Sequence, residues 1–173
     1  MAESDIPNYE RAFAPRPEVY AAWQRLNGAI KAGMDPRTYE LATLAAALRL
    51  RSSYCALAHG AAMIDQGLAD ADELAAVVAD RHAAGLSEAE VAIMDLAEQV
   101  VADATAVTPA DHDRLRALGL SDTDIFDVIA AASARAFFSK TLDATVAEPD
   151  ATFAALEPAA LRDALTVGRP ISR

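Results

Sequence analysis

The chain has 173 residues, the length of one ordinary domain, and this is enough to bury a sizeable core. Its 26 acidic residues outnumber its 15 lysines and arginines. The resulting net charge of −11 argues against nucleic acid and anionic membranes as partners, because both bind concentrated basic surfaces. The composition is 53% hydrophobic, much of it alanine, with 6% aromatic residues, which predicts closely packed helices rather than a sheet.

The start of the sequence lacks the charged, apolar and small-residue pattern of a signal peptide. No apolar run approaches the roughly twenty uncharged residues that a membrane-spanning helix needs. We therefore expect a soluble cytoplasmic protein. A single cysteine excludes a disulfide framework within the chain.

Residues 1–16 show no hydrophobic periodicity and contain two prolines, so we predict an extended N-terminal arm followed by one helical domain over residues 17–173. Pro17 suits the first position of a helix that ends near Ala32, before Gly33. Apolar residues at helical spacing are predicted to face the core from this helix: Val19, Trp23, Leu26 and Ile30.

A second helix is predicted from Asp35 and Pro36, which form an N-cap and first-turn pair, to about Leu50. Its apolar stripe consists of Leu41, Leu44 and Leu48. Glu40 lies at the margin of this stripe, a position typical of a solvated rim residue.

A third helix is predicted to start at Ser52 or Ser53. Residues three and four apart on it share one face, which would carry Ser52, Cys55, His59, Met63 and Gln66. Cys55 would lie in the first turn, where free backbone N–H groups, nearby arginines and a histidine favour the nucleophilic thiolate. A structural interpretation is also open, because a buried cysteine and a satisfied core histidine would show the same spacing.

Local start signals predict the remaining helices. The pairs typical of a capping box or N-cap are Asp70 with Glu73, Ser87 with Glu90, and Ser121 with Asp124. Another short helix is predicted from Thr108 and Pro109 to Gly119, and one more from about Pro158 to Leu165.

The pattern of Glu40, Ser52, Cys55 and His59 resembles that of the alkylhydroperoxidase D-like and carboxymuconolactone decarboxylase family. In the peroxidase branch of this family, a glutamate begins a helix, a Cys-x-x-Cys pair follows and a histidine closes the set. The flanks AAWQRLNGAIKAGMDPRTYELATLAAA and DATVAEPDATFAALEPAALRDALTVGRPISR resemble the peroxidase-related subgroup. One position departs from the pattern, because Ser52 stands where the first cysteine of the pair would be.

The resemblance implies an all-α, homo-oligomeric protein, a dimer, trimer or hexamer, with the alkylhydroperoxidase D-like helical fold. It implies an antioxidant enzyme of peroxiredoxin-type activity in which Cys55 reduces a small hydroperoxide. Glu40 would then face the next helix and relay protons with His59, helped by Ser52 or water. With Ser52 in place of a resolving cysteine, the second thiol would have to come from an external thiol or a thiol-reductant protein.

Two other functions remain open on the sequence. The decarboxylase branch of the family implies a lyase in which Glu40 and His59 perform acid–base chemistry and Cys55 is structural. A non-catalytic oligomeric binding protein would keep the same cluster as a satisfied polar core. We expect no cofactor and no metal, since Cys55 and His59 supply two ligands where zinc normally takes three or four.

Overall fold

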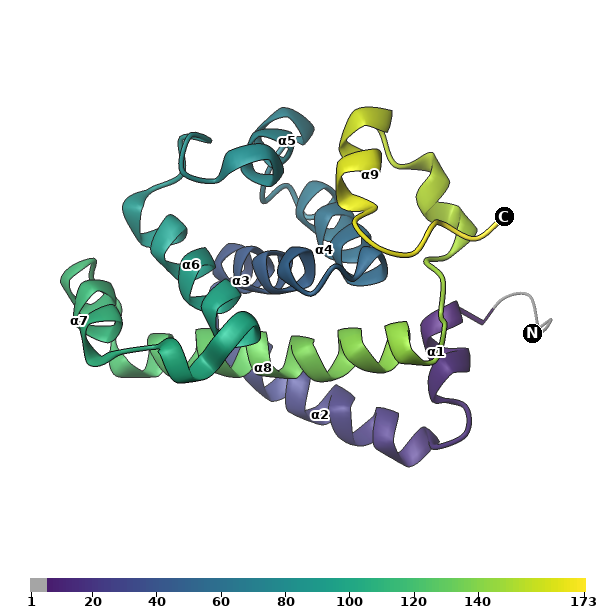
Figure 1. Ribbon diagram of the computed structural model, residues 1–173, viewed down its shortest axis with the longest axis horizontal. Helices are drawn as coiled ribbons and strands as arrows, with labels where there is room; N and C mark the ends of the chain where they lie inside the picture. Colours follow the sequence, from purple (N-terminus) through teal and green to yellow (C-terminus); the bar gives the residue numbers. More distant parts are fainter. Residues whose placement is uncertain (1–5) are drawn as a thin grey trace.

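The computed structural model describes residues 6–173, and these residues form a single helical domain without a β-strand (Figure 1). The α-helices are α1 (Asn8–Phe13), α2 (Pro17–Gly33), α3 (Pro36–Arg49), α4 (Ser53–Asp65), α5 (Ala71–Asp80), α6 (Glu88–Asp103), α7 (Pro109–Ala117), α8 (Asp122–Ala144) and α9 (Ala159–Leu165). Two short 3₁₀ helices, η2 (Ala104–Ala106) and η3 (Ala151–Ala155), follow α6 and α8. The prediction of an all-α domain is confirmed.

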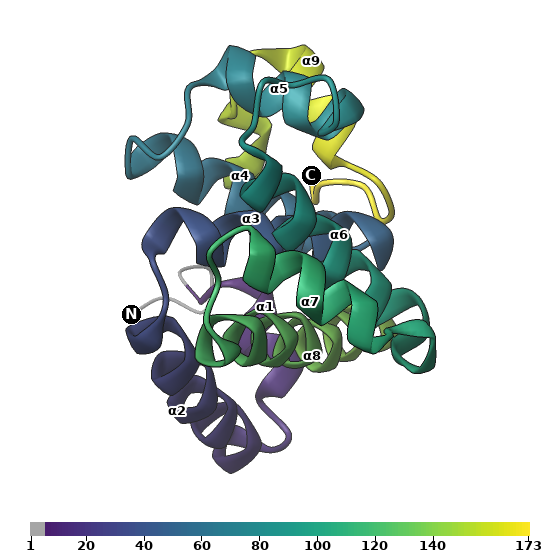
Figure 2. The ribbon, with the colours of Figure 1, turned by 90° about the vertical axis from the view of Figure 1, so that its left-hand side faces the viewer.

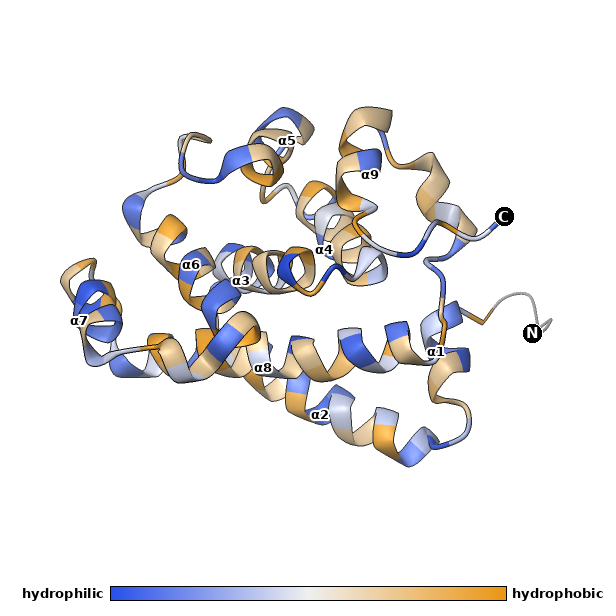
Figure 3. Ribbon diagram, viewed as in Figure 1, coloured by the Kyte–Doolittle hydropathy of each residue, from blue (hydrophilic) through white to orange (hydrophobic). Residues whose placement is uncertain are grey.

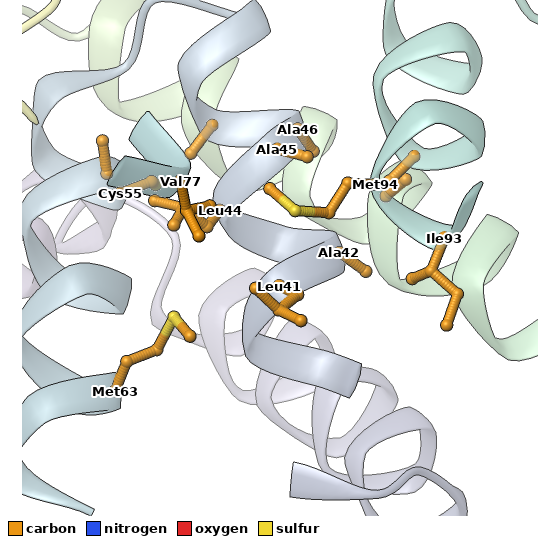
Figure 4. Close-up of a cluster of buried hydrophobic side chains, with 14 of the residues drawn as sticks. Leu41, Ala42, Leu44, Ala45, Ala46, Cys55, Met63, Val77, Ile93 and Met94 are labelled. Carbon is orange, nitrogen blue, oxygen red and sulfur yellow. The ribbon is translucent and has the colours of Figure 1, made fainter. Parts of the chain in front are cut away.

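Helix α3 is the centre of the bundle, packed against α4, α6 and α8 (Figures 1 and 2). Every residue from 39 to 47 is buried. This is expected of a helix that carries apolar or small side chains on nearly all sides. Figure 4 shows α3 side chains between Met63 of α4 and the pair Ile93 and Met94 of α6. The outer helices α2 and α7 instead mix hydrophilic and hydrophobic residues (Figure 3).

Side-chain caps fix several of the helix starts that the sequence predicted, although Ser52 makes no side-chain cap at the start of α4. Ser87 and Glu90 at the start of α6 form a capping box, and Ser121 and Asp124 do the same for α8. Asp35 accepts a hydrogen bond from the Thr38 backbone at the start of α3. These caps satisfy backbone N–H groups that have no partner inside the helix.

The N-terminal residues and Leu26 differ from the sequence predictions. Residues 8–13 form α1 rather than an extended arm, and Phe13 is buried against the rings of Tyr20 and Phe138. Residues 1–5 of the predicted arm lie outside the described residues. Leu26 is 54% exposed, because α2 lies on the outside of the bundle and packs mainly on α8.

Candidate active site

Helices α3 and α4 bring Glu40 and His59 into direct contact. His59 Nδ1 lies 2.6 Å from Glu40 Oε2, and Glu40 is 1% exposed while His59 is 9% exposed. A solvated rim position for Glu40 is therefore excluded. The two helices are connected by a tight turn in which Arg51 has a positive φ of 57°, and α4 runs back along α3 so that His59, in the middle of α4, meets Glu40 in the second turn of α3.

Glu40 is held as a carboxylate in this buried position. Lys31 Nζ from α2 lies 3.3 Å from Glu40 Oε1. Burial alone would raise the pKa of the Glu40 carboxyl, but the hydrogen bond from His59 and the charge of Lys31 outweigh burial and lower it. A buried carboxylate with two such partners remains ionised at neutral pH.

The His59 ring is neutral in this environment, and its tautomer follows from its contacts. Burial and the positive charge of Arg135 lower the pKa of His59 to about 4, against the opposing effect of Glu40. An ionised carboxylate accepts only, so the proton of the neutral ring lies on Nδ1, which donates to Glu40. Nε2 then carries the free lone pair of the ring, and because His59 lines a cavity, Nε2 can act as a base for a group bound there.

Cys55 lies in the first turn of α4, where unpaired backbone N–H groups favour a negative charge. It is 1% exposed. The guanidinium of Arg135 on α8 lies beside it, and its Nη1 donates to Cys55 Sγ at 3.7 Å. A guanidinium that donates to sulfur interacts more strongly with a thiolate, the nucleophilic form of cysteine, than with a thiol.

A cavity of about 390 Å³ connects these groups. One part of its lining is polar: Lys31, Glu40, Cys55, His59, Gln66 and Arg135. The other part is mainly aromatic: Tyr9, Tyr20, Trp23, Tyr54, Phe138 and Phe153. Concave sites with an apolar wall and a few convergent polar groups are typical of small-molecule binding.

Ser52 and Met63 do not line this cavity, although the helical pattern predicted a shared face with Cys55 and His59. Ser52 is the N-cap residue of α4, with φ −93° and ψ 96°, so its side chain does not follow the regular helix face. It is fully buried next to Asp143, whose pKa is raised by burial against the opposing effects of Ser52 and Arg169. Met63 packs in the core (Figure 4).

Three residues of the site were not predicted from the sequence: Lys31, Tyr39 and Arg135. They lie on α2, α3 and α8, so only the tertiary structure brings them to Cys55. Arg135 does have a signal in the sequence, because it is the single charged residue in the run AAASARAFF. A charge in an otherwise apolar helix face is either paired or functional.

No metal site accompanies these residues. Within residues 6–173, no three His, Cys, Asp or Glu side chains are grouped so that they would hold a metal ion. None of the helices in the same range is long and apolar enough to cross a membrane.

Comparisons with known proteins agree with this fold. The model of the carboxymuconolactone decarboxylase family matches residues 17–99, which include Glu40, Cys55 and His59. None of the curated proteins compared with the chain matches it.

Two solved structures have the same fold. One is described as an alkylhydroperoxidase AhpD core, an uncharacterized peroxidase-related protein from Ralstonia eutropha JMP134, with a TM-score of 0.77 at 23% identity over 86% of this chain and 79% of that chain. The other is an uncharacterized peroxidase-related protein from Silicibacter sp. TM1040, with a TM-score of 0.76 at 21% identity over 87% of this chain and 80% of that chain. The chain therefore has the fold of the alkylhydroperoxidase AhpD core, and its residues 17–99 match the model of the carboxymuconolactone decarboxylase family.

Proposed function

We propose that the protein is a thiol-dependent peroxidase with Cys55 as its nucleophile. One observation carries the proposal: Cys55 contacts a buried guanidinium and opens onto the same cavity as a neutral histidine held by an ionised glutamate. The arrangement pairs a nucleophile with a base, and the base with an orienting carboxylate. The peroxidase-related names of the two structural neighbours support the same reaction class.

The protein and the peroxide together supply every proton and bond that the reaction needs. His59 Nε2 accepts the Cys55 proton, directly or through water, and the imidazolium formed is stabilised by Glu40. The thiolate attacks one peroxide oxygen, the O–O bond breaks, and the leaving alkoxide takes the proton from His59. The products are a sulfenic acid on Cys55 and an alcohol, or water from hydrogen peroxide. Ser52 has no role in this route, since it does not line the cavity.

The second half of the cycle needs a thiol from outside the chain. Cys55 is the single cysteine of the sequence, so no second thiol of the same chain can condense with the sulfenic acid. An external thiol releases water and forms a mixed disulfide with Cys55. A second equivalent then releases the Cys55 thiol and an external disulfide.

The test is to trap sulfenic acid on Cys55 by mass spectrometry after exposure to hydrogen peroxide and to an organic hydroperoxide. We expect fast trapping in the wild-type protein, none in Cys55→Ser, and trapping at least about tenfold slower in His59→Gln, since general-base catalysis contributes about 10²-fold or more. His82→Gln is the matched control, because the His82 side chain is 59% exposed and lies outside the cavity. Trapping no faster than that of a free thiol would overturn the proposal.

A lyase is the second candidate, and the neutral His59 base on an ionised Glu40 is the observation that favours it. Proton abstraction next to a carbonyl would use these two groups and leave Cys55 structural. Activity that survives Cys55→Ala but disappears in His59→Gln would identify this alternative.

A further inference from the structure

Arg135 is a buried cation without a carboxylate partner. It is 4% exposed, and among residues 6–173 no Asp or Glu lies within ion-pair distance of its guanidinium. The half-buried Arg37 and Arg81, in contrast, each pair with two carboxylates. A buried charge is unfavourable unless an anion or several hydrogen bonds compensate it.

The contacts that Arg135 does make hold it without neutralising it. Its guanidinium lies over the rings of Trp23 and Phe138, at 5.8 and 5.6 Å from their centres. Nη2 donates to the Tyr39 hydroxyl at 3.3 Å, and that hydroxyl donates to Asn27 Oδ1 at 2.8 Å. Nε is buried without a hydrogen-bond partner. These contacts orient the guanidinium and leave its charge available.

Glu40 and Cys55 are two acidic groups that line the same cavity as Arg135, and Glu40 already has cationic and hydrogen-bond partners. Glu40 has Lys31 at 3.3 Å and His59 at 2.6 Å. The other acidic group is Cys55, whose Sγ lies 3.7 Å from Arg135 Nη1. A contact between a guanidinium and a neutral thiol is weak, whereas the same contact with a thiolate is a charge-assisted hydrogen bond.

We infer that Arg135 is a further catalytic residue, the permanent counter-ion of a Cys55 thiolate. An arginine stays protonated throughout the physiological range, so the thiolate would not depend on a charged His59. With Cys55 already a thiolate, neutral His59 takes the proton of the attacked peroxide oxygen instead and passes it to the leaving alkoxide, so the step still balances. The reaction role of this pair depends on the proposed function, in which Cys55 is the reacting atom.

The test measures the Cys55 thiolate without any peroxide. Thiolate absorbance near 240 nm, with Cys55→Ser as the blank, and alkylation by iodoacetamide are followed from pH 5 to pH 10. Arg135→Met keeps the side-chain length and removes the charge, while Arg135→Lys keeps the charge. Arg49→Met is the matched control, since it removes the same charge from a side chain that is 52% exposed.

We expect thiolate absorbance to appear at a lower pH in the wild-type protein than in Arg135→Met. Arg135→Met should be alkylated about tenfold more slowly at pH 7 and should reach its maximum rate at a higher pH. Arg135→Lys should fall between the two, and Arg49→Met should match the wild type. Circular dichroism and thermal melting show whether each variant folds. If Arg135→Met does not fold, the wild-type profile still decides, because an alkylation profile like that of a free thiol overturns the inference.

The outcomes also separate this inference from the proposed function. Arg135-dependent alkylation without sulfenic acid formation would support the ion pair and overturn the peroxidase. Sulfenic acid that forms equally fast in wild type and Arg135→Met, with unchanged alkylation profiles, would support the peroxidase and overturn the role of Arg135.

Discussion

His59 shows how a single buried ring links the site to stability. Its pKa is about 4 in the folded protein, since burial and Arg135 disfavour the charged ring. In the unfolded chain the ring returns to the ordinary value of about 6.5. Below pH 6.5 the unfolded chain therefore binds a proton that the folded chain does not bind.

The first prediction concerns the dependence of stability on pH. The contribution of neutral His59 to the free energy of unfolding is fully present above pH 6.5 and is lost as the pH falls to about 4, by an amount on the order of 3 kcal/mol. The lowered pKa of Glu40 acts in the same direction. Urea unfolding at pH 7, 6, 5 and 4 should give a flatter profile for His59→Gln than for the wild type. A wild-type profile no steeper than that of the variant would contradict this, and His82→Gln should follow the wild type.

The sequence predicted part of this site. Cys55 and His59 are four residues apart on one helix, so local geometry alone places them on the same face. The buried role of Glu40 depended on the family pattern, because a glutamate at the margin of an apolar stripe is by itself typical of a solvated rim residue. Arg135 was missed because it is 80 positions from Cys55, and no local rule predicts contacts at that separation.

At the scale of elements, helix starts were predictable because their signals are local. The Ser87 and Glu90 side chains each satisfy the other's backbone N–H, at 3.2 and 2.9 Å, and the sequence contains both residues at the required spacing. The short α1 was missed because six residues are too few to show a helical period. Leu26 was assigned wrongly to the core, because the spacing of apolar residues does not show whether another helix packs over that face.

The second prediction tests the cap of α6. Ser87→Ala removes the side-chain acceptor for the Glu90 backbone N–H and should lower the free energy of unfolding by about 1 kcal/mol. Urea denaturation measures the change. Ser87→Thr is the control, because threonine keeps the hydroxyl and should leave stability nearly unchanged. Equal losses in both variants would show that the hydroxyl does not act as a cap.

The third prediction concerns the contact between the start of α4 and the C-terminal tail. The Gly168 amide donates to Ser53 Oγ at 2.7 Å, and a Cβ on Gly168 would lie 2.1 Å from the Arg51 carbonyl oxygen. The Gly168→Ala variant must shift the backbone of the tail or of Arg51. We therefore expect its free energy of unfolding, measured by thermal unfolding, to fall by about 1 to 3 kcal/mol.

Gly28→Ala is the control for this prediction. A Cβ at Gly28 meets no atom within 4 Å, and the residue lies inside α2. This variant should gain about 0.5 to 1 kcal/mol from helix propensity. A Gly168→Ala protein as stable as the wild type would show that the tail does not depend on this close approach.

At the scale of the whole molecule, the fold places the sulfur in a cavity that a large partner cannot enter. Cys55 is 1% exposed, and the cavity of about 390 Å³ is lined by side chains from most of the chain's length. A protein thiol carried on a folded surface cannot reach Sγ without rearrangement of these elements. The cavity volume of about 390 Å³ is large enough for a small thiol.

The fourth prediction follows for the reductant. After oxidation with one equivalent of peroxide, Cys55 should be reduced by millimolar cysteine or 2-mercaptoethanol. It should not be reduced at a comparable second-order rate by reduced thioredoxin. Mass spectrometry of the mixed disulfide and recovery of the free thiol measure both reactions. Faster recovery with thioredoxin would show that the cavity opens to a protein surface.

One wall of the cavity joins segments from opposite ends of the sequence. The Asn8 backbone donates to Asp150 Oδ1 at 2.8 Å, and Tyr54 also donates to Asp150. Tyr9 and Phe153 line the cavity on this side. During synthesis, a ribosome that has made Glu40, Cys55 and His59 has still to make Arg135 and Asp150. The nascent chain therefore carries its cysteine for about a hundred codons before the enclosure around it can be completed.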